Sequence, residues 1–329
     1  LATIQRMKKN KKIIIGISIA TILITGYLVL DGILFDGIKP KSINENGFQA
    51  SYYANKNAKN KTAVVLIGGG QWGNYWGVEF ARKGFVGLSL PYSGNEGLPK
   101  LPEEIPLEYF ESALKWLCEQ PEVNPEKIVV MGASRNAELA LVVASTLPEL
   151  VSGVVTYAPS SVSWSNTVLP YNSDIVKPSW TYKGNDINYV PMDKISGNVS
   201  STINTLEYWK NGLNKVENAE EATIKVEKIK GPILLLSGKD DQVWPSSQMA
   251  DILEKRLEEN DFKYYFENIK YDNAGHLISS NPESHSDERT GKMTIQDKQY
   301  VFEYGGTNDG DFKAKQDAKI RVFKLIENL

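Results

Sequence analysis

The chain has 329 residues, of which 41% are hydrophobic and 23% are charged. These fractions are ordinary for a globular protein and exclude a disordered, collagen-like or coiled-coil chain. With 37 Lys and Arg against 40 Asp and Glu, the formal net charge is −3, so the chain lacks the basic excess needed to bind a nucleic-acid backbone. The single cysteine, Cys118, cannot form an internal disulfide, and with only two histidines beside it we predict neither a metal site nor a cofactor.

An uncharged, mostly apolar run covers residues 13–30, with five basic residues before it in the segment 1–12. At about 1.5 Å per residue, a helix over this run would be about 27 Å long, which is enough to cross the hydrocarbon core of a bilayer. Because basic residues favour the cytoplasmic side, we expect a single-pass signal-anchor in the membrane with the rest of the chain on the extracytoplasmic side. The alternatives are a cleaved signal peptide, although residues 27–31 lack the small residues of a cleavage site, and a buried helix of a soluble protein.

Residues 31–61 are polar and rich in Asn and Lys, so we predict a juxtamembrane linker with one strand near residues 48–53. From residue 62 onward, short apolar runs alternate with amphipathic segments. The strands are expected at 62–67, 86–90, 127–131, 151–157, 232–237 and 263–269, and the helices at 74–83, 107–119, 137–146, 248–260 and 312–329. This alternation is typical of a mostly parallel sheet with helices on both faces, and we predict one α/β domain over residues 62–329.

One long segment, residues 159–230, interrupts the alternation of strands and helices. It is polar and rich in Trp and Tyr, and we interpret it as an insertion that passes over the strand ends. Such an insertion usually forms a lid or one wall of a pocket, and a purely surface-covering role is the alternative.

A candidate nucleophile lies in the motif Gly-Ala-Ser-Arg-Asn at residues 132–136, between a predicted strand and a predicted helix. This is the context of a nucleophile elbow, in which a sharp turn holds a serine hydroxyl at the carboxyl end of a strand. The usual elbow is G-x-S-x-G, and Asn136 stands in place of its second glycine. We predict Ser134 as the nucleophile, with a role as a simple helix cap as the alternative.

The remaining members of a catalytic triad should follow in the order acid and then histidine, which is the order found in α/β-hydrolases. Asp240 and Asp241 follow the predicted strand 232–237, and we choose Asp241 as the acid, with Asp240 or a solvated turn as alternatives. His276 comes after the last predicted strand and is preceded by small residues, whereas His285 lies in a polar loop. We therefore expect His276 to be the general base.

An acyl-transfer mechanism also requires two backbone N–H donors for the oxyanion. The amide of Arg135, directly after the nucleophile, is the first candidate. The second should come from Gly70 or Gly69, in the glycine loop after the strand 62–67, because glycine lets the backbone approach a substrate closely. A phosphate-binding loop would be the alternative, but the spacing of neither common nucleotide motif fits.

With these residues identified, the chain resembles the C-terminal catalytic domain of the acyl-CoA thioesterase and bile acid-CoA:amino acid N-acyltransferase family. The resemblance covers residues 63–329. Its matching stretches are 66–70, 84–86, 98–100, 107–111, 121–123, 132–135, 138–140, 180–184, 226–232, 238–246 and 274–278. The resemblance implies an α/β-hydrolase fold and a triad that falls on Ser134, Asp241 and His276.

Two departures from the family pattern bear on function. The acyltransferase members use cysteine as nucleophile, so Ser134 favours hydrolysis, and Asn136 stands where members typically carry glycine. A domain outside the membrane would not meet cytoplasmic acyl-CoA, and we give the topology more weight because substrate transfers poorly between relatives.

The combined expectation is a membrane-anchored serine hydrolase that cleaves small-molecule acyl esters or thioesters through an acyl-enzyme. A non-catalytic acyl- or lipid-binding module is one alternative, and an acyltransferase or peptidase on the same scaffold is another. The sequence specifies no oligomeric state.

Overall fold

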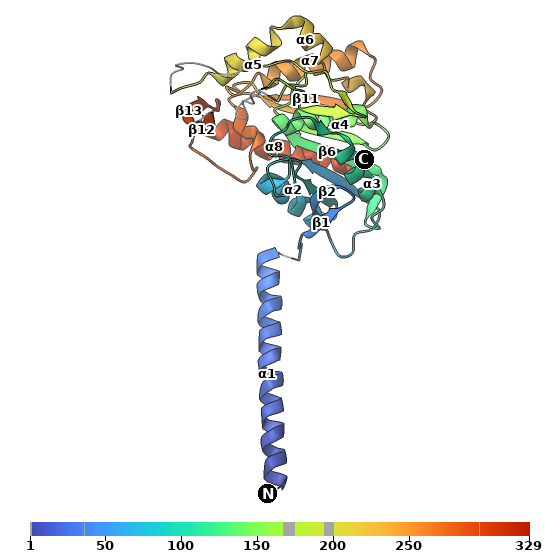
Figure 1. Cartoon of the computed structure of the whole chain (residues 1–329), viewed down its shortest axis with the longest axis vertical. Helices are drawn as coiled ribbons and strands as arrows, with labels where there is room; N and C mark the ends of the chain where they lie inside the picture. The colour runs from blue at the N-terminus through green and yellow to red at the C-terminus, as the bar shows by residue number, and fades with distance from the viewer. Residues whose placement is uncertain (1, 36, 167–174, 194–200, 296) are drawn as a thin grey trace. The chain divides into compact units, whose positions relative to one another are not determined.

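The computed structural model describes residues 2–35, 37–166, 175–193, 201–295 and 297–329, and divides the chain into two compact units, Leu1–Pro40 and Lys41–Leu329 (Figure 1). The first unit contains the helix α1 (Ala2–Phe35), which extends beyond the apolar run 13–30 at both ends. Its stretch Lys11–Leu30 has a mean hydropathy of 2.5, and none of this window is buried. By length and composition α1 can cross a membrane, and a signal sequence meets the same two criteria.

The second unit is built on an eight-stranded sheet with the strand order β1-β2-β4-β3-β6-β7-β10-β11. The strands are β1 (Lys41–Glu45), β2 (Phe48–Ala54), β3 (Lys61–Ile67), β4 (Val86–Leu90), β6 (Val123–Ala133), β7 (Gly153–Tyr157), β10 (Ile233–Gly238) and β11 (Phe266–Tyr271). β2 is antiparallel to both of its neighbours, and all other neighbouring strands are parallel. The loops that follow β3, β6, β10 and β11 therefore meet at one edge of the sheet.

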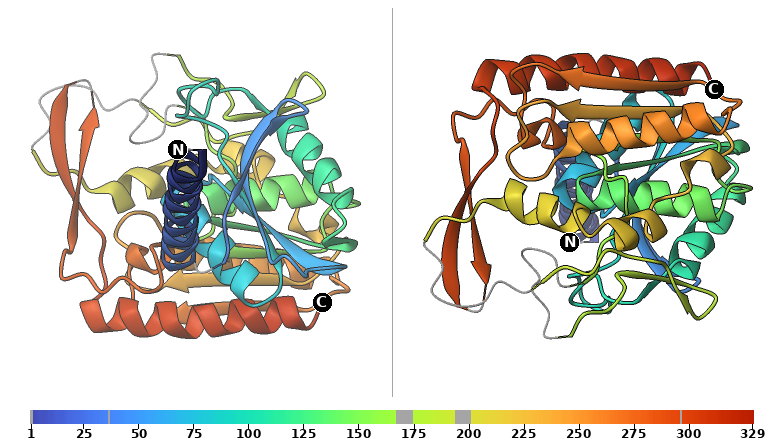
Figure 2. Two further views of the ribbon diagram at one scale, coloured as in Figure 1. Left: turned by 90° about the horizontal axis from the view of Figure 1, so that it is seen from below. Right: turned by 90° about the horizontal axis from the view of Figure 1, so that it is seen from above.

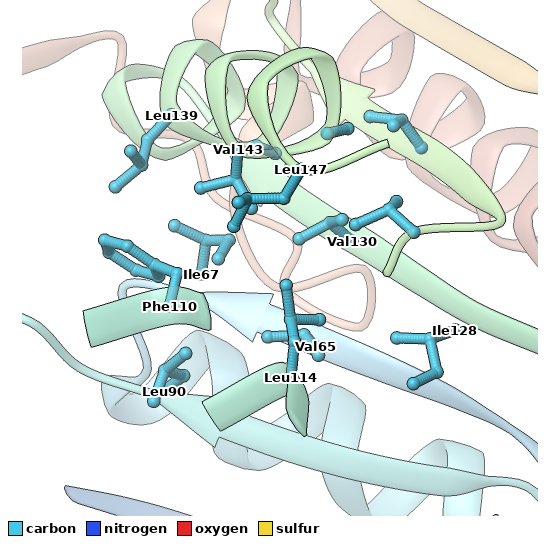
Figure 3. Packing of buried hydrophobic residues seen from close by; sticks show 14 of the residues in the cluster. Val65, Ile67, Leu90, Phe110, Leu114, Ile128, Val130, Leu139, Val143 and Leu147 are labelled. Carbon is cyan, nitrogen blue, oxygen red and sulfur yellow. The ribbon is translucent and has the colours of Figure 1, made fainter. Parts of the chain in front are cut away.

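Helices cover both faces of this sheet, as the continuous apolar strands predict. α3 (Glu108–Cys118), α4 (Arg135–Thr146) and α7 (Ser246–Glu259) share one apolar cluster, and α2 (Gly70–Arg82) and α8 (Asn308–Glu327) share the other. Alternate residues of β3 enter the two clusters, with Val65 in the first and Val64 in the second. Figure 3 shows part of the first cluster, where Leu139 and Val143 of α4 point toward the strands of the sheet.

The helices and parallel strands that the sequence predicts within residues 62–329 are all present, and each end lies within four residues of its predicted position. The linker expected over residues 31–61 is shorter in the structure, because residues 41–54 form β1 and β2 at the edge of the sheet. In β1 only Ile43 is buried. In β2 the buried side chains include Ala50 and Tyr52 on one face and Tyr53 on the other. Strands with one covered face carry a weaker apolar pattern than the doubly covered strands of the centre.

The described part of the insertion 159–230 contains four short elements and one helical turn, and its residues 167–174 and 194–200 lie outside the described residues. The elements are β8 (Trp180–Tyr182), β9 (Asn185–Asp186), α5 (Thr205–Leu213), α6 (Val216–Glu221) and the 3-10 turn η1 (Val226–Lys228). β8 lies between β9 and the short strand β5 (Ile105–Pro106). Trp164 and Trp209 are buried in a cluster with Trp244, which belongs to the loop after β10.

A hairpin of β12 (Thr290–Ile295) and β13 (Lys298–Glu303) lies between the 3-10 turn η2 (His276–Ser279) and α8. Figure 2 shows this hairpin on the side of the unit where α8 begins. The backbone N–H of Ile203 in the insertion donates to the carbonyl of Val301 in β13, at 2.9 Å. The hairpin and the insertion are therefore hydrogen-bonded to each other. Neither strand of the hairpin was predicted, because its sequence is largely polar.

Candidate active site

The predicted elbow lies at the sharp turn between β6 and α4. Ser134 has φ 57° and ψ −126°, a conformation that residues with a side chain rarely adopt and that stores about 1–3 kcal/mol of strain. Gly132 is required beside it, since a Cβ atom there would lie 2.0 Å from the carbonyl oxygen of Asn136. The Ser134 side chain makes no capping hydrogen bond to α4, so the alternative of a simple helix cap is not supported.

The three side chains predicted to form a triad are linked in series, with His276 within hydrogen-bonding distance of both Ser134 and Asp241. His276 Nε2 is 3.1 Å from Ser134 Oγ, and His276 Nδ1 is 2.9 Å from Asp241 Oδ2. Asp241 follows β10 and His276 follows β11, so both reach Ser134 from the edge where the parallel strands end. This arrangement can withdraw a proton from the serine hydroxyl, with the imidazole oriented by the carboxylate.

Asp241, rather than Asp240, faces the histidine. The side chain of Asp241 is almost fully buried, whereas Asp240 is exposed. Asp241 Oδ1 accepts hydrogen bonds from the backbone N–H groups of Val243 (2.9 Å) and Trp244 (3.2 Å), and Oδ2 accepts one from Ser246 Oγ at 2.7 Å. These donors fix the carboxylate and satisfy the lone pairs that the imidazole does not use.

The backbone around His276 is fixed by two contacts that sequence reasoning missed. Asp311, in the first turn of α8, accepts a hydrogen bond from the Gly275 N–H at 2.7 Å. Arg289 Nη1 in turn donates to Asp311 Oδ2 at 2.5 Å, and the Asp311 side chain is buried. The His276 N–H donates to the carbonyl of Tyr304 at 2.9 Å. No motif or periodicity marks Asp311, because its partner lies in another element.

The predicted oxyanion donors lie at two helix N-termini. Arg135 is the first residue of α4 and Gly70 is the first residue of α2, so neither N–H has an acceptor within its helix. Of the two glycines proposed from sequence, Gly69 already donates its N–H to the Leu66 carbonyl at 3.2 Å, which favours Gly70. Both helix termini also favour developing negative charge at this edge.

A buried carboxylate joins the nucleophile helix to the insertion. Glu138 Oε1 accepts hydrogen bonds from Trp180 Nε1 (2.8 Å), the Trp164 N–H (3.1 Å) and Ser163 Oγ (3.2 Å). Its other oxygen pairs with the Arg135 guanidinium. Burial raises the pKa of Glu138, and Arg135 together with these donors acts in the opposite direction. The predicted insertion is thus attached directly behind Ser134.

The second histidine takes no part in this arrangement. His285 is about half exposed, and its Nε2 lies 3.7 Å from Asp309 Oδ1. Among the residues that the structure describes, no group of three His, Cys, Asp or Glu side chains is arranged to hold a metal ion.

Comparison with known proteins gives one family and a consistent set of relatives. Residues 105–327 match the family described as BAAT / Acyl-CoA thioester hydrolase C terminal. Acyl-coenzyme A thioesterase 6 of Homo sapiens is 30% identical over 239 residues, which cover 72% of this chain and 52% of that protein. Acyl-coenzyme A thioesterase 1 of Mus musculus is 32% identical over 219 residues, which cover 64% of this chain and 46% of that protein. This chain therefore spans about half the length of the curated relatives it matches.

Solved structures show the same fold at low identity. A dienelactone hydrolase-like promiscuous phosphotriesterase from metagenomic libraries has a TM-score of 0.52 and 12% identity, and the match covers 89% of this chain and 99% of that one. This likeness shows the α/β-hydrolase fold, which agrees with the mostly parallel sheet.

Proposed function

The chain belongs to the BAAT / acyl-CoA thioester hydrolase C-terminal family, as its motifs indicated, and from this premise we propose that it hydrolyses acyl thioesters through an acyl-enzyme on Ser134. The observation that carries the proposal is the continuous hydrogen-bonded chain from Ser134 through His276 to the buried Asp241, at a strained elbow. The names of the relatives supply the substrate class, since they are acyl-coenzyme A thioesterases.

In the proposed first half-reaction, Ser134 Oγ attacks the thioester carbonyl while His276 Nε2 accepts the hydroxyl proton. Asp241 holds the proton on Nδ1 and stabilises the imidazolium that forms. The N–H groups of Arg135 and Gly70 donate to the tetrahedral oxyanion. The carbon–sulfur bond then breaks, and the thiol leaves with the proton from His276.

In the second half-reaction, water attacks the acyl-enzyme and His276 takes its proton. The second tetrahedral intermediate expels Ser134, which regains the proton from His276, and the carboxylic acid is released. Serine as nucleophile favours hydrolysis over transfer, because the family's acyltransferases use cysteine at this position.

The insertion provides one wall beside the proposed base. Its Trp209 packs edge-on against Trp244 at 5.2 Å between ring centroids, and Trp244 packs against the His276 ring at 6.2 Å. We propose that the insertion shields the His276–Asp241 pair from water and acts as a lid over the acyl group, with its tryptophans forming the core of that lid.

The proposed activity is tested by comparing turnover of a medium-chain acyl-CoA with turnover of the matched oxygen ester, using the full chain in detergent. Ser134→Ala and His276→Ala should each abolish thioester turnover. His285→Ala is the matched control for His276→Ala and should leave turnover unchanged. Thioester turnover that persists in Ser134→Ala would refute the mechanism. Turnover of the oxygen ester alone would show that the protein is an esterase and not a thioesterase. Adding an amine acceptor to the same assay separates transfer from hydrolysis by its product.

The second part of the proposal concerns location. We propose that α1 anchors the chain in a membrane, with the basic residues of 1–12 in the cytoplasm and the catalytic unit on the extracytoplasmic side. Protease added outside intact cells should then digest the catalytic unit. Protection of the unit until the cells are opened would place it in the cytoplasm, where acyl-CoA is available, and would overturn this topology.

A further inference from the structure

The residue that breaks the usual elbow pattern lies against the glycine loop. A Cβ atom on Gly68 would be 2.2 Å from Asn136 Nδ2 and 2.8 Å from Asn136 Oδ1. The amide of Asn136 therefore occupies the space that a side chain on Gly68 would need. Gly68 also has φ +91°, a conformation that residues with a Cβ rarely adopt. Asn136 and Gly68 fit together as a pair.

A third residue fixes the orientation of this amide. The Tyr92 hydroxyl, just beyond the end of β4, donates a hydrogen bond to Asn136 Oδ1 at 2.8 Å. The ring of Tyr92 is buried and packs edge-on against Phe110 (5.7 Å) and Trp180 (5.6 Å). Because the ring is held on both sides, its hydroxyl position is fixed, and with it the direction of the Asn136 side chain.

The glycine loop is supported from its other side by the segment after β4. The Gly68 N–H donates to the Leu90 carbonyl at 2.9 Å, and a Cβ on Gly69 would lie 2.7 Å from the backbone nitrogen of Pro91. The glycine loop is therefore packed between Leu90 and Pro91 on one side and Asn136 on the other.

This contact joins the two segments that carry the proposed oxyanion donors. Asn136 directly follows Arg135 on α4, and Gly68 precedes Gly70 by two residues. We propose that Asn136, oriented by Tyr92, is a positioning residue that sets the separation of the Arg135 and Gly70 N–H groups. The inference deepens the proposed function and rests on it. Asn136, which stands where the usual elbow has glycine, is on this proposal a spacer that the chain requires.

The oxyanion forms only after Ser134 attacks, so a displaced donor lowers kcat and leaves KM nearly unchanged. The test uses full-chain Asn136→Ala, Asn136→Gly, Tyr92→Phe and the Asn136→Ala/Tyr92→Phe double variant. Each is measured for kcat and KM with the thioester, for thermal unfolding, and for the rate of labelling by a fluorophosphonate. In that labelling, Ser134 Oγ bonds to phosphorus, fluoride leaves with the bonding electrons, His276 takes the serine proton, and the phosphoryl oxygen occupies the oxyanion site.

Both Asn136 variants should lower kcat and the labelling rate by about 10- to 100-fold, since a displacement of about 1 Å can cost that much. Tyr92→Phe should lower the two rates less than the Asn136 variants do, and its effect should be smaller once Asn136 is alanine, because the two side chains share one hydrogen bond. Tyr265→Phe removes a hydroxyl that donates to Glu267 Oε2 at 2.9 Å beside β11, and serves as the matched control with wild-type rates.

Wild-type or higher rates in Asn136→Gly would overturn the inference, and so would wild-type Ser134 that resists labelling. A rise in KM with unchanged kcat would also overturn it, as would a fall in kcat that parallels a fall in the unfolding temperature. Failure of the proposed function is separable. If Ser134 is labelled but no thioester is hydrolysed, the substrate proposal fails, while the labelling rates of the variants still decide the role of Asn136.

Discussion

Gly69 and Ser134 have nearly the same backbone conformation, with φ 57° and ψ −134° at Gly69 and φ 57° and ψ −126° at Ser134. Each is the last residue before a helix, and the two helices follow the neighbouring parallel strands β3 and β6. The same turn is thus used twice, once by a glycine and once by a residue with a Cβ atom. Strain of this kind is characteristic of positions where function fixes the residue.

Relief of this strain gives a prediction about stability. Ser134→Gly and Ser134→Ala should both abolish turnover, but Ser134→Gly should be more stable than Ser134→Ala by about 1 kcal/mol, because glycine adopts positive φ at little cost. Urea unfolding of the two full-chain variants measures this difference. Equal stability of the two would show that the elbow is not strained.

The buried position of Asp241 gives a second prediction. Asp241→Asn should lower kcat by about 10³- to 10⁴-fold, because the imidazole loses the carboxylate that holds its tautomer. Asp240→Asn changes the exposed neighbour and is the matched control, with kcat expected to stay near the wild-type value. Steady-state kinetics of both variants decides the matter. Comparable losses in the two would remove the assignment of the acid to Asp241.

The carboxylate of Glu138 gives a third prediction, about the insertion. Glu138→Ala should lower the free energy of unfolding by about 3–5 kcal/mol, since it leaves the Arg135 guanidinium and three other donors without their buried acceptor. Limited proteolysis should cut first within residues 159–230. Glu149→Ala removes the exposed partner of Lys230 and should leave the free energy of unfolding nearly unchanged, since solvent screens such a pair. An intact, protease-resistant insertion in Glu138→Ala would contradict this role.

A fourth prediction concerns stability at low pH. Lys319 Nζ on α8 lies 2.7 Å from Glu79 Oε2 on α2 and 2.7 Å from Glu283 Oε1, in the segment after η2. The hydrogen bond from Lys319, followed by one from Tyr75, lowers the pKa of Glu283 below its usual 4.5. A lowered folded-state pKa stabilises the fold above the unfolded value, and this stabilisation is lost as the pH falls through the folded value.

Lys319→Met should therefore unfold at a lower temperature than the wild type at about pH 7, and the two should approach each other below about pH 4. Thermal unfolding followed by circular dichroism across this range tests the prediction. A difference in midpoint that stays constant down to about pH 3 would show that the carboxylate pairs do not contribute.

The sequence predicted those parts of the molecule that leave a local signal. Continuous apolar runs such as that of β3 identified the parallel sheet, and the order of Ser134, Asp241 and His276 along the chain identified three side chains that lie together in the structure. Contacts between distant residues leave no such signal. The Gly275–Asp311 contact and the Tyr92–Asn136 contact join residues 36 and 44 positions apart, in segments whose local patterns are unremarkable.

The hairpin β12–β13 was missed for a related reason. Its strands are largely polar, and their apolar residues Ile295 and Tyr300 pack on Ile203 of the insertion rather than on the central sheet. A strand stabilised by a distant surface segment lacks the alternation that marks a strand covering the core.

A covalent acyl intermediate on Ser134 is detected most directly by mass spectrometry of the full chain quenched with acid during thioester turnover. In the wild type one acyl group should be added to the peptide containing Ser134, and in Ser134→Ala none should be added. Thioester hydrolysis without an adduct, or an adduct on another residue, would contradict the acyl-enzyme mechanism.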